Sequence, residues 1–246
     1  MIRALCLTAL VIVAAAVLAG PAAAQEISVD LGAEGSLATR SIQLLVVITL
    51  LSLVPGLAMM VTCFPFIVTV LSILRQGIGL QQSPPNMLIV TLALFLTYFV
   101  MEPVFVEAWE GGIVPLLEES IDVEDAFVRV MEPFRIFMAG RIDPDTYATL
   151  ADLRPDLPGA ESGATEPLSV LVPSFLLSEV SRAFQIGFLL FLPFLIIDLV
   201  VAAVLMSMGM MMVPPAIVSL PFKLAFFVIA DGWALVSESL VRGYLG

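Results

Sequence analysis

The chain has 246 residues, of which 60% are hydrophobic and 13% are charged, with a formal net charge of −12. Soluble domains carry roughly 25% charged residues, so this chain has too few to cover a water-facing surface. It has no histidine and only two cysteines, Cys6 and Cys63. These counts exclude imidazole catalysis, imidazole metal sites and multi-cysteine metal sites. The composition therefore predicts a membrane protein.

The first 24 residues have the pattern of a signal peptide. Arg3 precedes an apolar run from Ala4 to Ala19, and the following stretch ends in an A-x-A cleavage pattern at Ala24. We expect cleavage after Ala24, which starts the mature chain outside the cytoplasm. Residues 25–41 are polar and predict an exposed lead-in.

Residues 42–106 predict a first membrane hairpin. From Ile42 to Leu74 the chain carries no charge for 33 residues, more than the ~20 that a bilayer requires. We expect a first span over 42–61, then a broken helix that continues to Arg75, with kinks at Pro55 and Pro65. A turn over 75–86 leads to a second span over 87–106.

Residues 107–170 predict an acidic extramembrane segment. Between Glu102 and Leu168 there are fifteen acidic residues and four arginines, a net charge of −11. Such a block is typical of a solvated face, although a specific cation site is an alternative, and it argues against nucleic acid as a partner. Within it we expect a helix over 123–139 that Pro133 breaks, and a second helix that starts at Asp143.

Residues 171–246 predict a second membrane hairpin with a methionine-rich turn. Its spans are expected over 183–206 and 216–236. Because basic loops stay cytoplasmic, Arg75 places the loop between the first two spans inside, and the acidic segment on the periplasmic side. The signal peptide supports the same orientation. The predicted fold is an all-α membrane protein with four apolar, proline-kinked helical segments in hairpins and a small helical periplasmic segment.

Three ionisable residues lie inside the last two predicted spans: Asp198, Lys223 and Asp231. Each costs roughly 2.5–3.5 kcal/mol at the centre of a bilayer, so each should face protein or water. If the turn centres on Met210, Asp198 and Lys223 lie at the same depth, about 18–20 Å from it. They can therefore pair, within one chain or between neighbours. The alternative is that each reaches a membrane interface separately.

Two further patterns involve charge. Glu179 and Arg182 are three residues apart, which makes them neighbours on a helix. Asp198 and Asp231 could suggest an intramembrane aspartyl protease, but that chemistry needs two carboxylates in contact, and these lie at different depths. We do not favour the protease interpretation.

The turn of the second hairpin is unusually apolar. Five of the seven residues from Met206 to Met212 are methionine. Methionine is flexible and repacks around irregular shapes, so the cluster could form a deformable seal. The plainer alternative is apolar filler at a hairpin turn. A turn is normally polar, however, so something must cover this one.

Several long motifs resemble the FliP family, whose members are core subunits of the flagellar type III export gate. The resemblance covers about residues 40–246 and is weakest in the acidic segment. One departure from the usual family pattern lies at Cys63-Phe-Pro-Phe66, where a serine-Phe-Thr-Arg sequence is common. The matching stretches are Pro84–Asn86, Leu92–Thr97, Gln185–Phe188, Pro193–Leu199, Met208–Pro215, Leu220–Leu224 and Asp231–Trp233.

The resemblance implies a non-enzymatic role without a cofactor or metal. It implies a homo-oligomeric ring with FliQ-like and FliR-like subunits, in the bacterial inner membrane at the flagellar basal body. Unfolded flagellar proteins would pass through the ring as cargo. Met210, Met211 and Met212 would form the pore gasket, and the charged residues would serve assembly or subunit contacts: Asp198, Lys223, Asp231, Glu179 and Arg182. The rival interpretation is a stand-alone ion channel or secondary transporter that uses the intramembrane Asp and Lys residues.

Overall fold

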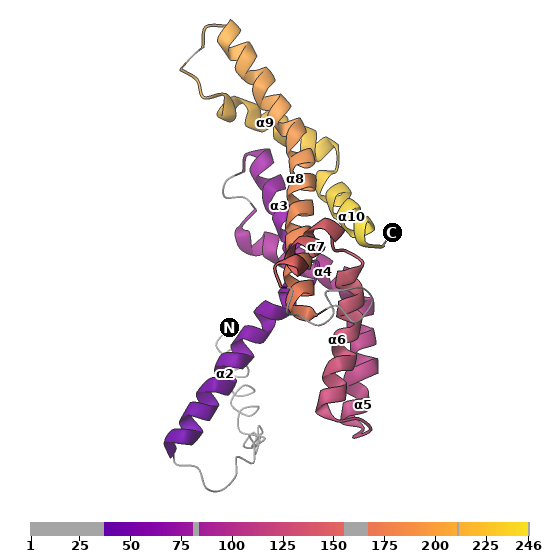
Figure 1. Ribbon diagram of the computed structural model, residues 1–246. Helices are drawn as coiled ribbons and strands as arrows, with labels where there is room; N and C mark the ends of the chain where they lie inside the picture. Colours follow the sequence, from indigo (N-terminus) through magenta and orange to yellow (C-terminus); the bar gives the residue numbers. More distant parts are fainter. Residues whose placement is uncertain (1–36, 81–83, 155–166, 211, 246) are drawn as a thin grey trace, which may run out of the picture. The chain divides into compact units, whose positions relative to one another are not determined.

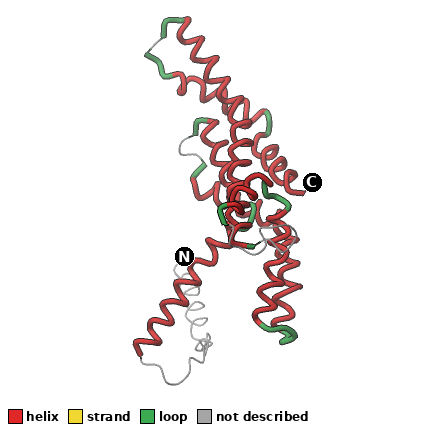
Figure 2. The backbone as a smooth tube through the Cα atoms, viewed as in Figure 1, coloured by secondary structure: helices red, strands yellow, loops and turns green. Residues whose placement is uncertain are grey.

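The computed structural model describes residues 37–80, 84–154, 167–210 and 212–245, and every element in these ranges is a helix (Figures 1 and 2). The predicted signal peptide and most of the predicted lead-in lie outside the described residues. The chain divides into two compact units, Met1–Leu51 and Ser52–Gly246. The helical fold class predicted from the sequence is confirmed.

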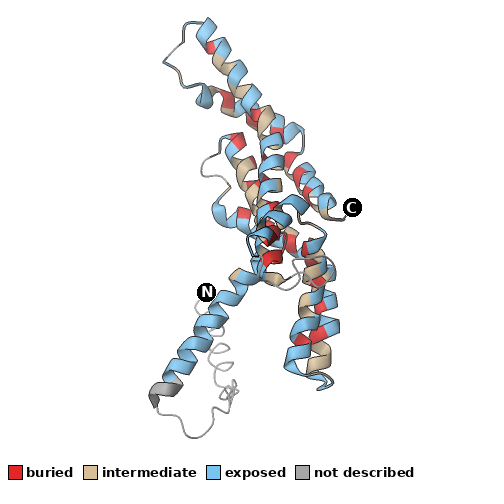
Figure 3. Cartoon of the chain, viewed as in Figure 1, coloured by how far each residue is buried: buried red, intermediate tan, exposed pale blue. Residues whose placement is uncertain are grey.

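Helix α2 spans Leu37–Met60 and begins in the first unit. Its stretch from Ser41 to Met60 is long and apolar enough to cross a membrane, and none of it is buried (Figure 3). Pro55 lies inside the helix without ending it. A helix that is apolar all round, and that no described part of its own chain covers, needs lipid or another protein around it.

The predicted interruption after the first span is present at residues 61–63, and α3 follows over Phe64–Ile78. Thr62 fixes the break, because its Oγ1 donates to the Met59 carbonyl at 2.8 Å and accepts from the Phe64 N–H at 3.3 Å. Pro65 lies in the first turn of α3, where a missing N–H costs nothing. Pro65 therefore starts a helix here and does not kink one.

The second predicted span corresponds to α4, Asn86–Ala108. A π-helical turn, η1 (Trp109–Ile113), and the short α5 (Val114–Leu117) continue it. Helices α6 (Val123–Ala139) and α7 (Pro144–Asp152) complete the acidic segment.

Two aspartates cap the helices of the acidic segment. Asp122 accepts from the Asp125 N–H at 2.8 Å at the start of α6, and Asp143 accepts from the Thr146 N–H at 3.2 Å at the start of α7. The helix start predicted at Asp143 is therefore confirmed. Side-chain caps of this kind satisfy N–H groups that have no partner within the helix.

The predicted break at Pro133 is wrong, because α6 runs through it without interruption. Pro133 is itself buried, and Phe134 packs on Phe105 of α4 with ring centroids 5.9 Å apart. Burial on this face offsets the roughly 3 kcal/mol that an internal proline costs a helix.

Helix α8 is a single helix of 40 residues, Leu168–Ser207, with Pro173 and Pro193 inside it. It joins the stretch predicted to precede the third span to the span itself. Helix α9 (Pro215–Ile229) then returns alongside the last part of α8 (Figure 1). Helix α10 spans Gly232–Leu245.

The fourth span was predicted as one helix over 216–236, and the structure corrects this. Helices α9 and α10 meet at a 60° bend. Asp231 stands in the bend with a left-handed φ of 47°, and Gly232 follows it. A Cβ on Gly232 would lie 2.2 Å from the Phe227 ring, so any larger residue would displace that ring. The described residues thus hold three helices long enough to cross a membrane, or four if the bent pair is counted as one span.

The core of the second unit lies between α3 and α8. Helix α3 buries Ile67, Val70, Leu71 and Leu74. Two glycines let the helices approach: a Cβ on Gly187 would lie 2.5 Å from Ile73 Cδ1, and one on Gly77 would lie 3.0 Å from the Phe194 ring. Close contact of this kind requires small residues on one helix.

The glycine pair of the π-helical turn provides a matched test of packing. We expect Gly112→Ala to lower the free energy of unfolding by about 1–3 kcal/mol through overpacking. The added methyl would lie 2.4 Å from Val130 Cγ2 and 3.1 Å from the Ala126 carbonyl oxygen of α6. Gly111→Ala is the control, because its methyl meets nothing within 4 Å; we expect a change within about 0.5 kcal/mol. Equilibrium unfolding in detergent measures both, and equal losses would refute the packing argument.

Candidate functional site

Asp198 of α8 and Lys223 of α9 form an ion pair within one chain. The Lys223 Nζ lies 2.6 Å from Asp198 Oδ2. Ser219, one turn before Lys223, donates its Oγ proton to Asp198 Oδ1 at 2.5 Å. The lysine side chain is 7% exposed and the aspartate side chain 33% exposed. The contact predicted from matched depth is therefore present in the structure.

Lys223 also contacts a third helix. Its Nζ donates to the Gly77 carbonyl at 3.1 Å. Gly77 lies in the last turn of α3, which ends at Ile78 and is followed by the left-handed Gly79. The last carbonyls of a helix lack intrahelical donors and form its negative end, where a cation is favourable. Lys223 therefore joins the carboxyl end of α3 to the α8–α9 hairpin.

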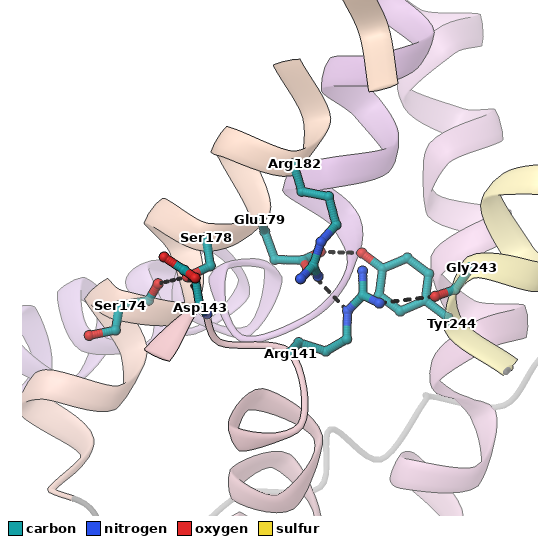
Figure 4. Close-up of polar contacts among 8 residues, drawn as sticks. All are labelled: Arg141, Asp143, Ser174, Ser178, Glu179, Arg182, Gly243 and Tyr244. Atoms are coloured by element: carbon teal, nitrogen blue, oxygen red, sulfur yellow. Dashed lines mark hydrogen bonds and ion pairs between the residues drawn. The ribbon is translucent and has the colours of Figure 1, made fainter. Parts of the chain in front are cut away.

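A second polar cluster surrounds Glu179, whose side chain is completely buried. Arg141, just after α6, donates its Nε proton to Glu179 Oε1 at 3.2 Å, and Arg182 donates to the same oxygen at 3.2 Å. The Tyr244 hydroxyl of α10 donates to Oε2. Figure 4 shows all three donors converging on this carboxylate. The Glu179–Arg182 contact predicted from their spacing is present.

Arg141 connects the acidic segment to the end of α10 in two further ways. Its guanidinium lies 4.1 Å from the centre of the Tyr244 ring, and it donates to the Gly243 carbonyl at 2.9 Å. The Tyr244 ring also packs edge-on against Phe66 of α3, with centroids 5.5 Å apart. A planar cation that stacks on an aromatic ring and donates to oxygen uses both recognition modes of arginine.

Ser178 adds a tie beside this cluster. Its hydroxyl accepts from the Asp143 N–H at 3.0 Å and donates to the Ser174 carbonyl at 2.7 Å. The start of α7 is thus held against α8 (Figure 4). Sequence reasoning missed Arg141, Tyr244 and Ser178, because their partners lie 35 to 102 residues away in the chain.

Asp231 stands apart from both clusters. Among the described residues, its carboxylate makes no hydrogen bond or ion pair, and its side chain is exposed at the α9–α10 bend. The structure therefore does not bring Asp231 and Asp198 together as a carboxylate pair. The described ranges also hold no group of three or more His, Cys, Asp or Glu side chains that could bind a metal ion.

The methionine-rich turn is exposed. Met212 is 96% exposed and Met210 is 41% exposed, while Met211 lies outside the described residues. Gly209 has a φ of +73°, the left-handed conformation that ends α8. The turn thus presents Met212 almost entirely uncovered by the described residues, and Met210 partly so.

Comparison with known proteins decides the family. The model of the FliP family matches residues 47–240. The chain belongs to the FliP family. The flagellar biosynthetic protein FliP of Caulobacter vibrioides is 48% identical over 243 residues, covering 98% of this chain and 91% of that protein. FliP of Rhizobium meliloti is 44% identical over 95% of this chain and 97% of that protein. FliP of Bacillus subtilis is 44% identical over 84% and 93%, respectively.

The matched region of this FliP-family chain contains most of the polar contacts described above. Asp198, Lys223, Gly77, Glu179, Arg141 and Arg182 all lie within residues 47–240. Tyr244 and Gly243 lie just beyond it.

Charge replacement tests the Asp198–Lys223 pair. We expect Asp198→Asn to lower the free energy of unfolding by about 1–3 kcal/mol, because it leaves the buried Lys223 ammonium without its counter-charge. Lys223→Asp should lower the free energy of unfolding further, and adding Asp198→Lys should restore only part of that loss. The reason is that an aspartate at position 223 would face the Gly77 carbonyl. Unfolding in detergent measures each variant, and no easing at all in the double variant would leave the pair unsupported.

The Glu179 cluster has a matched control in α10. Tyr244→Phe should cost about 1–3 kcal/mol of unfolding free energy, because a buried carboxylate oxygen loses its donor. Arg242→Ala should change it by less than about 0.5 kcal/mol, because surface pairs contribute little; the Arg242–Glu238 pair has side chains that are 79% and 62% exposed. The same unfolding assay compares the two. A loss from Arg242→Ala as large as that from Tyr244→Phe would contradict this assignment.

Proposed function

We propose that this chain is a core subunit of the flagellar type III protein export gate. In this proposal several copies form an oligomeric ring with FliQ-like and FliR-like subunits, in the bacterial inner membrane at the flagellar basal body. The acidic segment faces the periplasm, and unfolded flagellar proteins pass through the ring. The names of the relatives support the flagellar part, because each is a flagellar biosynthetic protein.

The observation that carries the proposal is the uncovered methionine turn. A single chain that exposes Met212 at 96%, with Met210 beside it, leaves a flexible apolar tip in need of neighbours. Copies arranged around an axis would bring these tips together, and Met210, Met211 and Met212 would then close a pore. Unbranched thioether side chains can adapt to a passing chain of varying width.

Exposed apolar surface elsewhere supports assembly. Leucine, isoleucine and phenylalanine side chains remain exposed along α2, α4 and α8 (Figure 3). Apolar patches of this extent on a single chain mark membrane or protein contacts. Asp198 and Lys223, by contrast, pair with each other, and Lys223 also donates to the Gly77 carbonyl. Their use favours a structural role over the ion path that a stand-alone channel or transporter would need.

The role of Asp198, Lys223, Glu179 and Arg182 in subunit contacts follows from the same proposal. The two clusters hold the hairpins in a fixed relation within each copy, so that neighbouring copies meet on a constant surface. The charged residues thus support assembly indirectly, because they fix the conformation of each subunit. No catalytic step and no cofactor is part of the proposed function.

If the methionines seal the pore, shortening them should let ions pass. Replacing Met210, Met211 and Met212 together by Ala should raise the ion conductance of membranes that contain the assembled complex, while export of flagellar proteins continues. Shortening three side chains widens a constriction without removing any charge. Conductance in reconstituted bilayers and secretion from cells are measured in parallel. Met206→Ala, in the last turn of α8, serves as control, and unchanged conductance in the triple variant would count against the seal.

A further inference from the structure

The α9–α10 bend forms one wall of an open apolar groove with a volume of about 810 Å³. The end of α3 and the start of α4 form the opposite wall. The groove is lined mainly by leucine, isoleucine and aromatic side chains, and Asp231 is the one ionisable residue among its described lining residues. The members used below are Ile78, Leu88, Leu92, Phe227, Asp231 and Ser237.

Backbone geometry fixes Asp231 at this groove. Its φ of 47° is left-handed, a conformation that glycine adopts without steric cost and aspartate only with some. A larger residue at position 232 would force the Phe227 ring to move, because a Cβ there would lie 2.2 Å from that ring. The bend therefore holds the Asp231 carboxylate in a constrained position beside apolar side chains. Constrained backbone of this kind is concentrated at functional sites.

The Asp231 carboxylate has no partner within the described part of the chain. Helices α9 and α10 together are long and apolar enough to cross a membrane, and a carboxylate within such a pair must face water or a cation. Among the described side chains none donates to Asp231. A positively charged side chain from another molecule could pair with the Asp231 carboxylate.

The basic residues of this chain do not supply that cation. Every described basic side chain outside the acidic segment is already bound to an oxygen of its own chain. Those residues are Arg75 on Pro84 and Asn86, Arg182 on Glu179, Lys223 on Asp198, and Arg242 on Glu238. A second copy of the chain could offer a basic side chain from this set only by giving up one of these contacts, of which the exposed Arg242–Glu238 pair is the weakest. A subunit of different sequence is the better source.

We propose that the groove at the α9–α10 bend receives an apolar helix of a different membrane subunit that carries a lysine or arginine, whose charge pairs with Asp231. Apolar side chains of that helix fill the space between Leu88, Leu92 and Phe227. The ion pair fixes the position of the helix along the groove. This inference rests on the proposed function, in which the chain assembles with other subunits.

Site-specific crosslinking tests the groove. The chain is co-expressed with its FliQ-like and FliR-like subunits, and a thiol-reactive benzophenone is attached to Ser237→Cys in the groove. The native Cys63 is completely buried and shielded from the reagent. Ser239→Cys is the matched control, because it is exposed on the same helix and lies outside the groove. Mass spectrometry identifies the crosslinked peptide.

We expect Ser237→Cys to give an adduct with another subunit, on an apolar peptide that contains lysine or arginine, and Ser239→Cys to give little. Asp231→Asn, which tolerates the same left-handed φ, should reduce the adduct roughly tenfold or more, since it removes only the charge. Asp231→Lys should abolish the adduct, and replacing the partner's basic residue by Asp should restore it.

Three outcomes overturn the proposal: an adduct formed only with a second copy of the chain, an adduct formed only with lipid, or an adduct that Asp231→Asn leaves unchanged. The export-gate proposal fails on a separate measurement. If the methionine variant causes no leak while the charge-dependent adduct forms, the pore role is wrong and the docking surface stands. If the leak is found without the adduct, the reverse holds.

Discussion

The close contact between α3 and α8 is the constraint on which the rest of the second unit depends. Gly77 and Gly187 remove the side chains that would hold the two helices apart. Once the helices are in contact, the aliphatic face of α3 is buried against α8. The same approach brings the end of α3 within hydrogen-bonding distance of Lys223. Packing in the apolar core and the hydrogen bond from Lys223 to Gly77 thus both depend on one contact.

Helix α8 also separates the two polar clusters. Glu179 and Asp198 are nineteen residues apart on it, roughly 28 Å along a straight helix. The first cluster connects α8 to the acidic segment and to the end of α10, and the second connects it to α3 and α9. The charged residues of these two clusters join elements that are distant in the sequence, and apolar packing supplies the remaining contacts. Asp231 makes no such contact within the described part of the chain.

Local sequence predicted much of this fold because local signals decide helices. The uncharged run from Ile42, the Asp143 cap and the matched depth of Asp198 and Lys223 all follow from spacing along the chain. Pro133 and the bend at Asp231 do not, because burial decides whether a proline is tolerated, and the fit of Gly232 against Phe227 decides where a span bends. Only part of the Glu179 cluster was predictable from the sequence. Arg182 is one helical turn from Glu179, whereas Arg141 and Tyr244 reach it only through tertiary folding.

The bond from Lys223 to Gly77 has an evolutionary consequence, because its acceptor is a main-chain carbonyl. Every residue possesses that atom, so the bond makes no demand on the chemistry of the α3 side chains. It requires only that position 77 stay small enough for the helix end to approach α8. Helix α3 can therefore diverge along its exposed face and keep the Lys223–Gly77 hydrogen bond, whereas Lys223 and Asp198 must change together. A chimera that exchanges α3 between relatives should keep this joint as long as it keeps Gly77.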